Sequence, residues 1–530
     1  RFDQGPSLLL LPHLFVEAFH DLGTSLEAEG VKLIKCEPNY NFWFGDGESF
    51  EPSTDIARMK TEVEKWEGKD GFERYLGFLQ ESHRHYELSV KHVLRKNFTS
   101  LLSTMKSSFL RHLLALHPFE SIYSRASKYF WTERLRRIFT FGSMYMGMSP
   151  FDAPETYSSL QYTELAEGIW YPEGGFHRII EALVNVGERL GVTYRLSTPV
   201  AQILLTRDSS RAIGVLLSSG EQLSADIVVD NSDLVYAYNN PLPPPTTATA
   251  LSKRLASCSS ISFHWALDIQ VPTLTAHNIF LADEYRKSFD NILKKQLIPE
   301  QPSFYVNVLS RVDPTAAPQG SDAHAGSNAP TTSTSASNAY HNANPTSKSL
   351  PPTTQEWLTM LALARRTVLT TIRARTGVDL SPHILHENVN MPLSWRSLLN
   401  LDKGAILGLS HSFFNVLCFR PTTRGRLGGR LGTGFLEEMG GGIVSVVADA
   451  LGGGGDAVGG LYFVGASTYP GTGVPICLAW SKVASEQILG DLGMAVPWNA
   501  GGNKDAGVMG TVGGKGIDEK RTRPLLNWFH

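Results

Sequence analysis

The sequence predicts a mixed α/β fold, and three observations support this prediction. A chain of 530 residues, 42% of them hydrophobic, is long enough to bury the cores of two or three packed domains. A helical apolar pattern followed by short β-rich runs occupies residues 168–233. Nearer the other end, residues 461–489 read as an apolar strand, a glycine loop and an apolar helix. Strands and helices that follow one another in this way predict α/β units.

The chain carries almost no net charge, because 48 Lys and Arg residues nearly cancel 51 Asp and Glu residues. No net field favours nucleic acid or an anionic membrane, and we expect the substrate not to be recognised by charge. The cysteines lie far apart without a CxxC pair, which argues against a disulfide framework and a zinc site and favours a reducing compartment. They are Cys36, Cys258, Cys418 and Cys477.

Apolar runs in the first quarter of the chain are short. The longest, residues 7–16, is interrupted by Pro12 and His13 and falls below the roughly 20 residues of a membrane-spanning helix, so we expect no transmembrane helix. Residues 101–122 are apolar at helical spacing. This stripe either packs into a core or forms a wall that faces a lipid-like substrate or the membrane surface.

Residues 168–233 predict one helix and several strands. Gly174 and Gly175 form a turn that opens the helix, and strands follow at residues 192–196, 200–205, 212–217 and 223–229, with a hairpin turn at residues 218–220. Ligands of open α/β sheets lie beyond the carboxyl ends of strands, so Asn231 and Asp233 are candidate ligand-binding residues at the rim. The apolar side of the helix is expected to consist of Phe176, Ile179, Ile180, Leu183 and Leu190.

Three segments have the composition of flexible loops. Residues 313–354 are dense in Pro, Ser, Thr, Ala and Asn, which cannot bury enough apolar surface to order themselves. Residues 422–460 and 500–516 are rich in glycine. We therefore expect a disordered insertion and two flexible glycine-rich stretches.

The glycine loop within residues 461–475 carries the most specific chemical signal. Gly465, Gly471 and Gly473 let the backbone approach a flat ligand closely, and Pro475 suits the first helical position because it has no N–H. Bare amides and the positive end of the helix dipole would stabilise negative charge on the N1 and C2 carbonyl region of a reduced flavin. The alternative is an ordinary strand-to-helix connection.

The same segment resembles the carboxy-terminal FAD motif of bacterial-type and fungal phytoene desaturases, within the amine oxidase and protoporphyrinogen oxidase group of flavoproteins. It departs from that motif at Tyr469, where the family usually has histidine. Further stretches resemble the family in the same order, and most closely its fungal members. They are residues 2–7, 131–150, 168–175, 401–411 and 419–421.

The resemblance implies an FAD-binding Rossmann-like domain of the amine oxidase and glutathione reductase type, with an inserted substrate- and membrane-associated domain. It implies that FAD contacts residues from both ends of the chain, and it implies no metal ligand. The cofactor-binding residues are expected to be Gly5, Pro6, Val200, Asn231, Asp233, Gly465, Ala466, Ser467, Thr468, Gly471, Gly473, Val474 and Pro475.

Segment boundaries follow from these matches. The FAD-binding part is expected at residues 1–20, 168–240 and 461–492, and a helical substrate-binding region at residues 21–167. A substrate domain is expected at residues 241–421 with its insertion at 313–354, a Gly-rich insertion at 422–460 and a flexible tail at 493–530.

Members of this family begin with a βαβ unit that bears GxGxxG and holds the FAD pyrophosphate. No such motif occurs in this sequence. Because the family places its counterpart of residues 5–7 shortly after that unit, we expect this chain to be a fragment that begins just past it. As it stands, we expect it to bind FAD poorly or not at all.

The reaction implied by the resemblance belongs to carotenoid biosynthesis: FAD-dependent desaturation of CH–CH bonds in 15-cis-phytoene, toward lycopene or more desaturated carotenes. Reoxidation requires oxygen or a quinone. We expect an intracellular protein held peripherally at an endomembrane or lipid surface, with no nucleic-acid partner. The alternatives are a carotene isomerase, another amine oxidase-like flavoenzyme, or an inactive fragment.

Two residues are candidates for contact with the reacting groups. Arg136 lies among apolar neighbours in the middle motif, where the alternative is a salt-bridged helix arginine, and His411 either approaches the flavin or caps a turn. His83, His85 and His92 suggest metal binding, but they lie in a charged stretch and are expected to belong to a solvated helix face.

Overall fold

The computed structural model describes residues 7–94, 117, 119–242, 251–252, 254–295, 297–316, 331–336, 354–411, 420–427, 456–469 and 471–499. The chain divides into two units, residues 1–484 and 485–530. In the second unit the described residues comprise the last turns of the helix α16 (Val474–Asp491) and a short 3-10 helix (Pro497–Asn499). There the Trp498 indole donates a hydrogen bond to Glu486 over 2.8 Å.

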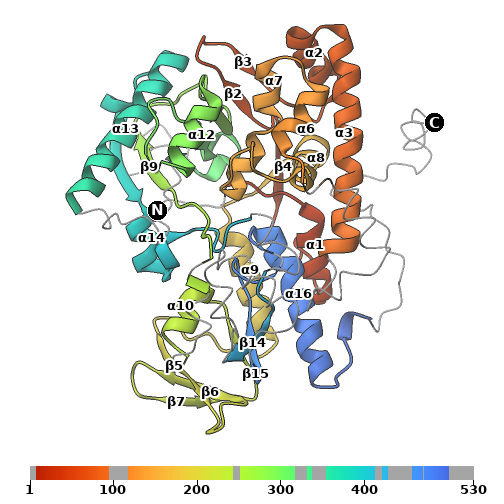
Figure 1. Ribbon diagram of the computed structural model, residues 1–530, viewed down its shortest axis with the longest axis vertical. Coiled ribbons are helices and arrows are strands. Elements are labelled where there is room, and N and C mark those ends of the chain that lie inside the picture. The colour runs from red at the N-terminus through yellow and green to blue at the C-terminus, as the bar shows by residue number, and fades with distance from the viewer. Residues whose placement is uncertain are drawn as a thin grey trace, which may run out of the picture. The chain divides into compact units, whose positions relative to one another are not determined.

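A seven-stranded sheet forms the centre of the first unit, in the order β13-β9-β12-β11-β10-β2-β3 (Figure 1). Its strands pair antiparallel except for β10 and β2, which run parallel. In chain order they are β2 (Asn41–Trp43), β3 (Ser49–Phe50), β9 (Ile261–Leu267), β10 (His277–Phe280), β11 (Phe304–Val308), β12 (Thr331–Ala336) and β13 (Ile384–Asn390).

Helix α13 (Thr354–Thr376) packs on this sheet through one apolar face. Ala364, Val368 and Ile372 recur every four residues, are fully buried, and join Phe263 and Trp265 of β9 in one cluster. This spacing places the three side chains on the same side of a helix. Their burial therefore fixes α13 on the sheet, while its other face meets solvent.

A second part of the first unit consists mainly of helices that pack around an aromatic core. Phe130 and Phe139 stack at 4.3 Å between ring centroids, and Phe78 meets both rings. The helices are α1 (Pro12–Asp21), α2 (Ile56–Glu67), α3 (Lys69–Ser89), α6 (Ile122–Tyr129), α7 (Glu133–Ile138) and α8 (Ser158–Tyr162), with α12 (Tyr285–Leu293) nearby in the same core. A two-stranded sheet joins β1 (Leu33–Cys36) to β4 (Ile169–Pro172).

Two three-stranded sheets complete the described fold (Figure 1). One contains β14 (Arg424–Leu427), β15 (Asp456–Phe463) and β8 (Val228–Asp230), and β15 and β8 run parallel. The other is a meander of β5 (Val200–Leu205), β6 (Ala212–Leu217) and β7 (Gln222–Ser224). Along the chain, α9 (His177–Arg189) precedes β5, α10 (Leu234–Asn239) follows β8, and α14 (Pro392–Leu399) precedes β14.

The helix and hairpin expected in residues 168–233 form, with differences. Ile179 of α9 is buried together with Ala182 and Val186, whereas Ile180 and Leu190 are exposed, so the buried stripe is narrower than predicted. Residues 192–196 form no strand, because Tyr194 folds back onto α9 beside Gly187. The last expected strand is divided into β7 and β8.

Residues 331–336 differ most from expectation. The composition of residues 313–354 predicts disorder, yet β12 lies between β9 and β11 and pairs with both through its backbone. A strand in the middle of a sheet satisfies its N–H and C=O groups on both sides, whatever its side chains contribute. The expected helix at residues 101–122 falls almost entirely outside the described residues. None of the described helices has the length and apolar character needed to cross a membrane.

Candidate functional site

The carboxyl ends of β8 and β15 meet at one edge of their parallel sheet. Phe463 pairs with Asp230, and the Val464 amide donates a hydrogen bond to the Asp230 carbonyl over 3.0 Å. One residue further, Gly465 has φ +118°, and a Cβ there would stand 2.8 Å from Oδ1 of Asn231. Only glycine permits this approach. The fold thus brings together the two rim segments that the sequence predicts separately, 234 positions apart.

The segment 407–411 lies against the same glycine loop. The Leu409 amide donates a hydrogen bond to Oγ of Ser467 over 3.2 Å, and a Cβ on Gly408 would collide with that hydroxyl. On its other side, the Gly408 carbonyl accepts a hydrogen bond from the Ser257 amide over 2.8 Å. Residues 407–411, which resemble the family's segment before the FAD motif, therefore form one wall of the loop.

Arg420 connects these two segments from a fully buried position. Its Nε donates to the Thr468 carbonyl over 3.0 Å, and its two terminal nitrogens donate to the carbonyls of Ser410, Leu409 and Ala466. Burial lowers the pKa of the guanidinium to about 10. The Arg420 guanidinium therefore supplies hydrogen-bond donors to backbone carbonyls that have no partner in a regular helix or strand. The sequence places Arg420 in a matching motif, but its residue type alone does not reveal this role.

His411 is a buried polar residue of this region. It is 2% exposed, and neither ring nitrogen has a hydrogen-bond partner among the residues that the structure describes. Burial, and then the Arg420 charge, lower its pKa to about 3, while the Met146 backbone opposes this shift. The ring is therefore neutral at physiological pH. A Cβ on Gly471 would stand 3.3 Å from its Nε2.

The residues of this loop fit a flavin. Gly471 and Gly473 have φ +137° and +108°, so the loop turns without a side chain on the face beside His411. A neutral imidazole both donates and accepts one hydrogen bond, which suits the carbonyl oxygens and ring nitrogens of an isoalloxazine. The first turn of α16 follows directly, with the Cys477 amide bound to the Gly473 carbonyl over 2.8 Å, and Pro475 occupies its second position.

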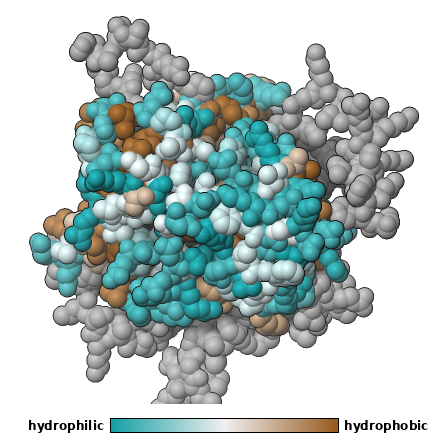
Figure 2. Space-filling model, turned by 90° about the horizontal axis from the view of Figure 1, so that it is seen from above, coloured by the Kyte–Doolittle hydropathy of each residue, from teal (hydrophilic) through white to brown (hydrophobic). Residues whose placement is uncertain are grey.

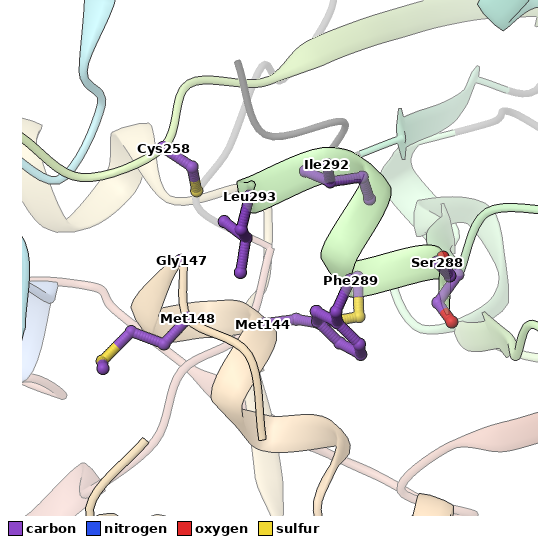
Figure 3. A pocket seen from close by; sticks show the side chains of 9 residues that line it. Met144, Gly147, Met148, Cys258, Ser288, Phe289, Ile292 and Leu293 are labelled. Atoms are coloured by element: carbon purple, nitrogen blue, oxygen red, sulfur yellow. The ribbon is translucent and has the colours of Figure 1, made fainter. Parts of the chain in front are cut away.

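An apolar pocket lies near the start of the segment 407–411, and Figure 3 shows the side chains that line it. A Cβ on Gly147 would meet Sγ of Cys258 and lie 3.4 Å from Leu407. Leu407 therefore lies beside the pocket residue Gly147, while the next two residues, Gly408 and Leu409, contact Ser467 of the glycine loop. The pocket lining comes from the 3-10 helix Phe141–Met146 and the two residues after it, from Cys258, from α12 and from Ser303 before β11. The lining residues are Met144, Gly147, Met148, Cys258, Ser288, Phe289, Ile292, Leu293 and Ser303.

Sequence reasoning missed this pocket, because residues 144–148 lie more than 100 positions before the other residues that line it. Met144 and Met148 carry no local signal beyond hydrophobicity. Phe289, Ile292 and Leu293 share one face of α12, which a helical pattern indicates as core. No spacing rule joins the two groups.

Other predicted site residues have partners of their own. Arg136 donates from Nε to the Phe130 carbonyl over 2.8 Å. Asp233 caps α10 by accepting from the amides of Val235 and Tyr236, each over 3.0 Å. Val200 begins β5 and is 43% exposed. Gly5 and Pro6 lie outside the described residues.

The histidines of α3 divide into two kinds. His83 is half-exposed beside Glu87, as expected of a solvated helix face, with Nε2 3.5 Å from a carboxylate oxygen. The expectation is wrong for His85, which is 1% exposed because α8 packs against this face of α3. The side chain of His92 lies outside the described residues.

Comparisons with known proteins identify close relatives. Residues 2–277 match the family described as flavin containing amine oxidoreductase. The chain is 61% identical to the phytoene desaturase of Cercospora nicotianae over 94% of its own length and 83% of that relative. It is 50% identical to the phytoene desaturase of Neurospora crassa, over 98% of its length and 82% of that relative. A fatty acid isomerase structure from P. acnes aligns over 92% of this chain and 86% of its own, at 10% identity and a TM-score of 0.48.

Proposed function

Because this chain belongs to the phytoene desaturases of the flavin-containing amine oxidoreductase family, we propose that it desaturates phytoene with FAD as cofactor in carotenoid biosynthesis. The observation that carries this proposal is the segment 407–409, in which Leu407 approaches Gly147 of the apolar pocket and Gly408 and Leu409 contact Ser467 of the glycine loop. A flavin held in the loop and a polyene held in the pocket would be neighbours.

When bound, the flavin supplies a two-electron acceptor for the hydride that leaves the polyene. The chain's own residues bind the flavin and the polyene and orient them. The amides of Gly471 and Gly473 and the positive end of α16 would stabilise negative charge on a reduced flavin. Neutral His411 holds one donor and one acceptor beside Gly471. Arg420 keeps the loop in position through four backbone carbonyls.

The pocket recognises an uncharged chain. Its lining is mainly methionine, leucine, isoleucine and phenylalanine, so binding gains roughly 25 cal/mol per Å² of apolar surface removed from water. The near-zero net charge of the protein agrees with a substrate that carries no charge. A linear C40 polyene such as phytoene is both apolar and uncharged, as this pocket and the protein's charge balance require.

The proposal includes an acceptor and a lipid surface. Oxygen or a quinone reoxidises the flavin, and the protein meets an intracellular membrane peripherally. The support is α14, on which Leu393, Leu398 and Leu399 are 42%, 68% and 56% exposed. The face of the molecule in Figure 2 is mostly hydrophilic, with apolar side chains gathered in its upper part. Exposed leucines on a nearly neutral protein suit insertion between lipid headgroups.

The test is turnover by protein expressed from its complete coding sequence. Purified protein with added FAD is mixed with vesicles that contain 15-cis-phytoene, and products are separated by chromatography with absorbance detection. We expect coloured products of the phytoene-to-lycopene series, and a flavin spectrum that travels with the protein. A colourless preparation that ignores FAD, or one that oxidises amines and leaves phytoene unchanged, would refute the proposal.

A further inference from the structure

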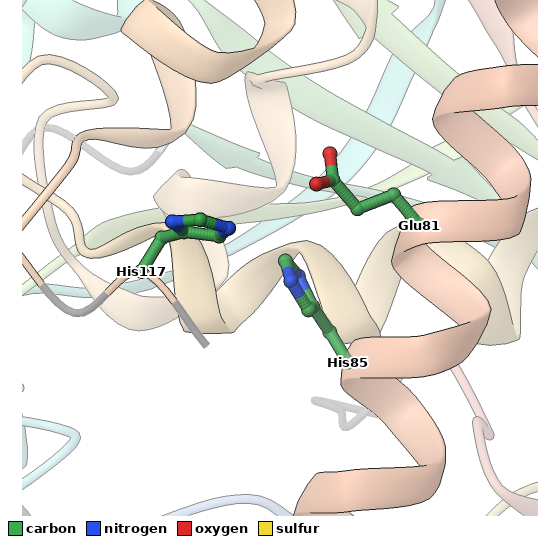
Figure 4. Close-up of side chains that lie close together, drawn as sticks. All are labelled: Glu81, His85 and His117. Carbon is green, nitrogen blue, oxygen red and sulfur yellow. The ribbon is translucent and has the colours of Figure 1, made fainter. Parts of the chain in front are cut away.

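Helix α3 carries a cluster of metal-ligating side chains that the proposed reaction does not use. Glu81 and His85 lie one helical turn apart and face His117 (Figure 4). One ligand atom from each of the three residues lies within 4.8 Å of the others. Two imidazoles and a carboxylate at this separation are a common ligand set for zinc and related divalent cations.

His85 is oriented for such a role. Its Nδ1 lies 3.0 Å from Oγ of Ser158 and 3.4 Å from Oε1 of Glu155, and all three side chains are buried. With Nδ1 held by these oxygens, Nε2 is the ring nitrogen left for a ligand. Metal-bound histidines typically make this second contact to a carboxylate, which fixes the ring and raises its basicity.

The surroundings contain more carboxylates than cations. Arg125 pairs with Glu81 and Glu120, Lys128 pairs with Glu120 at 2.5 Å, and Glu155 lies against His85. The second oxygen of Glu155, Oε2, is buried and has no hydrogen-bond partner within the described part of the chain. An uncompensated carboxylate oxygen in a buried site is costly, and a cation within the cluster would lower that cost.

Glu81 retains room for a metal ion. It accepts hydrogen bonds from Arg125 Nε and Tyr129, over 2.8 and 2.9 Å, and a further one from the Arg125 terminal nitrogen. A carboxylate offers about four lone-pair positions, so one is left. Arg125 and Tyr129 would then hold Glu81 in place, as hydrogen bonds to ligating carboxylates commonly do.

We propose that Glu81, His85 and His117 bind one zinc-class divalent cation, with Glu155 as the positioning partner of His85. The cation tethers α3 to position 117, which is 32 residues further along the chain. Three protein ligands leave a fourth position for water. The role is structural, because the stretch contributes no residue to the glycine loop or the pocket described above.

The experiment is zinc binding by the untagged full-length protein, followed by calorimetry and by metal analysis after dialysis. We expect one zinc per chain and a higher thermal midpoint with zinc. We expect His117→Ala to abolish both effects, and Glu155→Gln to weaken zinc binding by about 10- to 100-fold. His83→Ala is the matched control, because His83 lies on the same helix but is half-exposed and outside the cluster, and it should bind as the unchanged protein does.

Cobalt provides an independent reading of the ligand set. Co(II) bound by two imidazoles, a carboxylate and water should give a visible absorption band, which zinc displaces and which His117→Ala lacks. His117 is only partly buried, so this variant is expected to keep its far-UV circular dichroism. Absence of zinc binding, or binding by His117→Ala with unchanged affinity, overturns the proposal. Either result leaves the flavin and phytoene assays untouched.

Discussion

At Gly471 the loop backbone has a positive φ and passes directly beside His411. Substitution by alanine adds one methyl group and so tests whether the loop requires glycine at this position. We expect Gly471→Ala to destabilise the protein by about 1–3 kcal/mol, because alanine strains a backbone at φ +137° and crowds the ring nitrogen at 3.3 Å. Flavin content, measured by absorbance after purification, should fall with it.

The matched control for this prediction is Gly490→Ala. Gly490 lies within the last turns of α16, where an added Cβ meets nothing within 4 Å. There alanine should stabilise the helix by about 0.5–1 kcal/mol and leave flavin content unchanged. Equal losses in both variants would mean that position 471 has no special conformational requirement.

A second residue, Glu164, gives a prediction about pH. Burial raises its pKa to about 8, although Tyr40 donates a hydrogen bond to it over 3.1 Å. Its native form binds a proton that the unfolded chain releases above about pH 4.5. Stability from this group is therefore complete below that pH and is lost as pH rises through 8, by about 1.4 kcal/mol per pH unit at most.

Glu164→Gln tests the predicted direction of this pH dependence of stability. Glutamine keeps the acceptor for Tyr40 and cannot ionise, so its stability should fall less than that of the unchanged protein between about pH 6.5 and 8. Below that window the buried His277, whose pKa is lowered to about 3 by burial, acts in the opposite direction, since the unfolded chain takes up its proton. Urea unfolding at several pH values measures the difference, and parallel curves for both proteins would contradict the assignment.

At the scale of elements, the parts with a local signal were predictable and the parts assembled at a distance were not. The strand, glycine loop and helix at residues 456–491 follow from hydrophobic runs, glycines and Pro475. The pocket does not, because Met148 and Phe289 meet only in the folded chain. Strand β12 escaped prediction because two neighbouring strands supply the hydrogen bonds that its composition does not suggest. His85 was misjudged because its burial depends on α8, a separate helix.

Arg420 joins two such elements, and its shape is predicted to matter more than its charge. Arg420→Lys retains the cation but cannot reach four carbonyls from one ammonium, so we expect a loss of roughly 1–3 kcal/mol and a lower flavin content. Arg195→Lys is the control, because Arg195 makes an exposed pair with Glu221 and should change stability by less than about 0.5 kcal/mol. Indistinguishable thermal midpoints for the two variants would mean that the hydrogen bonds from Arg420 to the four carbonyls do not stabilise the protein.

Helix α14 gives the prediction for membrane contact. We expect Leu398→Glu to reduce binding to neutral lipid vesicles by about tenfold or more, because an inserted leucine gains roughly 1.5–3 kcal/mol on leaving water. Leu196→Glu changes a leucine that is even more exposed, at 87%, in the turn before β5 and should bind as before. Vesicle flotation measures the bound fraction, and a similar loss in both variants would place the contact elsewhere.

For the whole molecule, the balance of 48 basic and 51 acidic residues predicts weak dependence on salt. Vesicle binding and phytoene turnover should change by less than about twofold between about 0.05 and 0.5 M NaCl, since screening removes little attraction from a nearly neutral protein. A steep decline with salt, as polybasic surfaces show, would mean that local charge directs the membrane contact.

The parallel pairing of β8 with β15 also governs when this protein becomes functional during its synthesis. Asp230 leaves the ribosome 233 residues before its partner Phe463. At about 5–20 residues per second, the nascent chain waits on the order of 10 to 50 s with that edge uncovered. During this interval no flavin can be captured at the glycine loop, and chaperones have their opportunity to bind. Premature termination anywhere before residue 463 should therefore leave a colourless, aggregation-prone product.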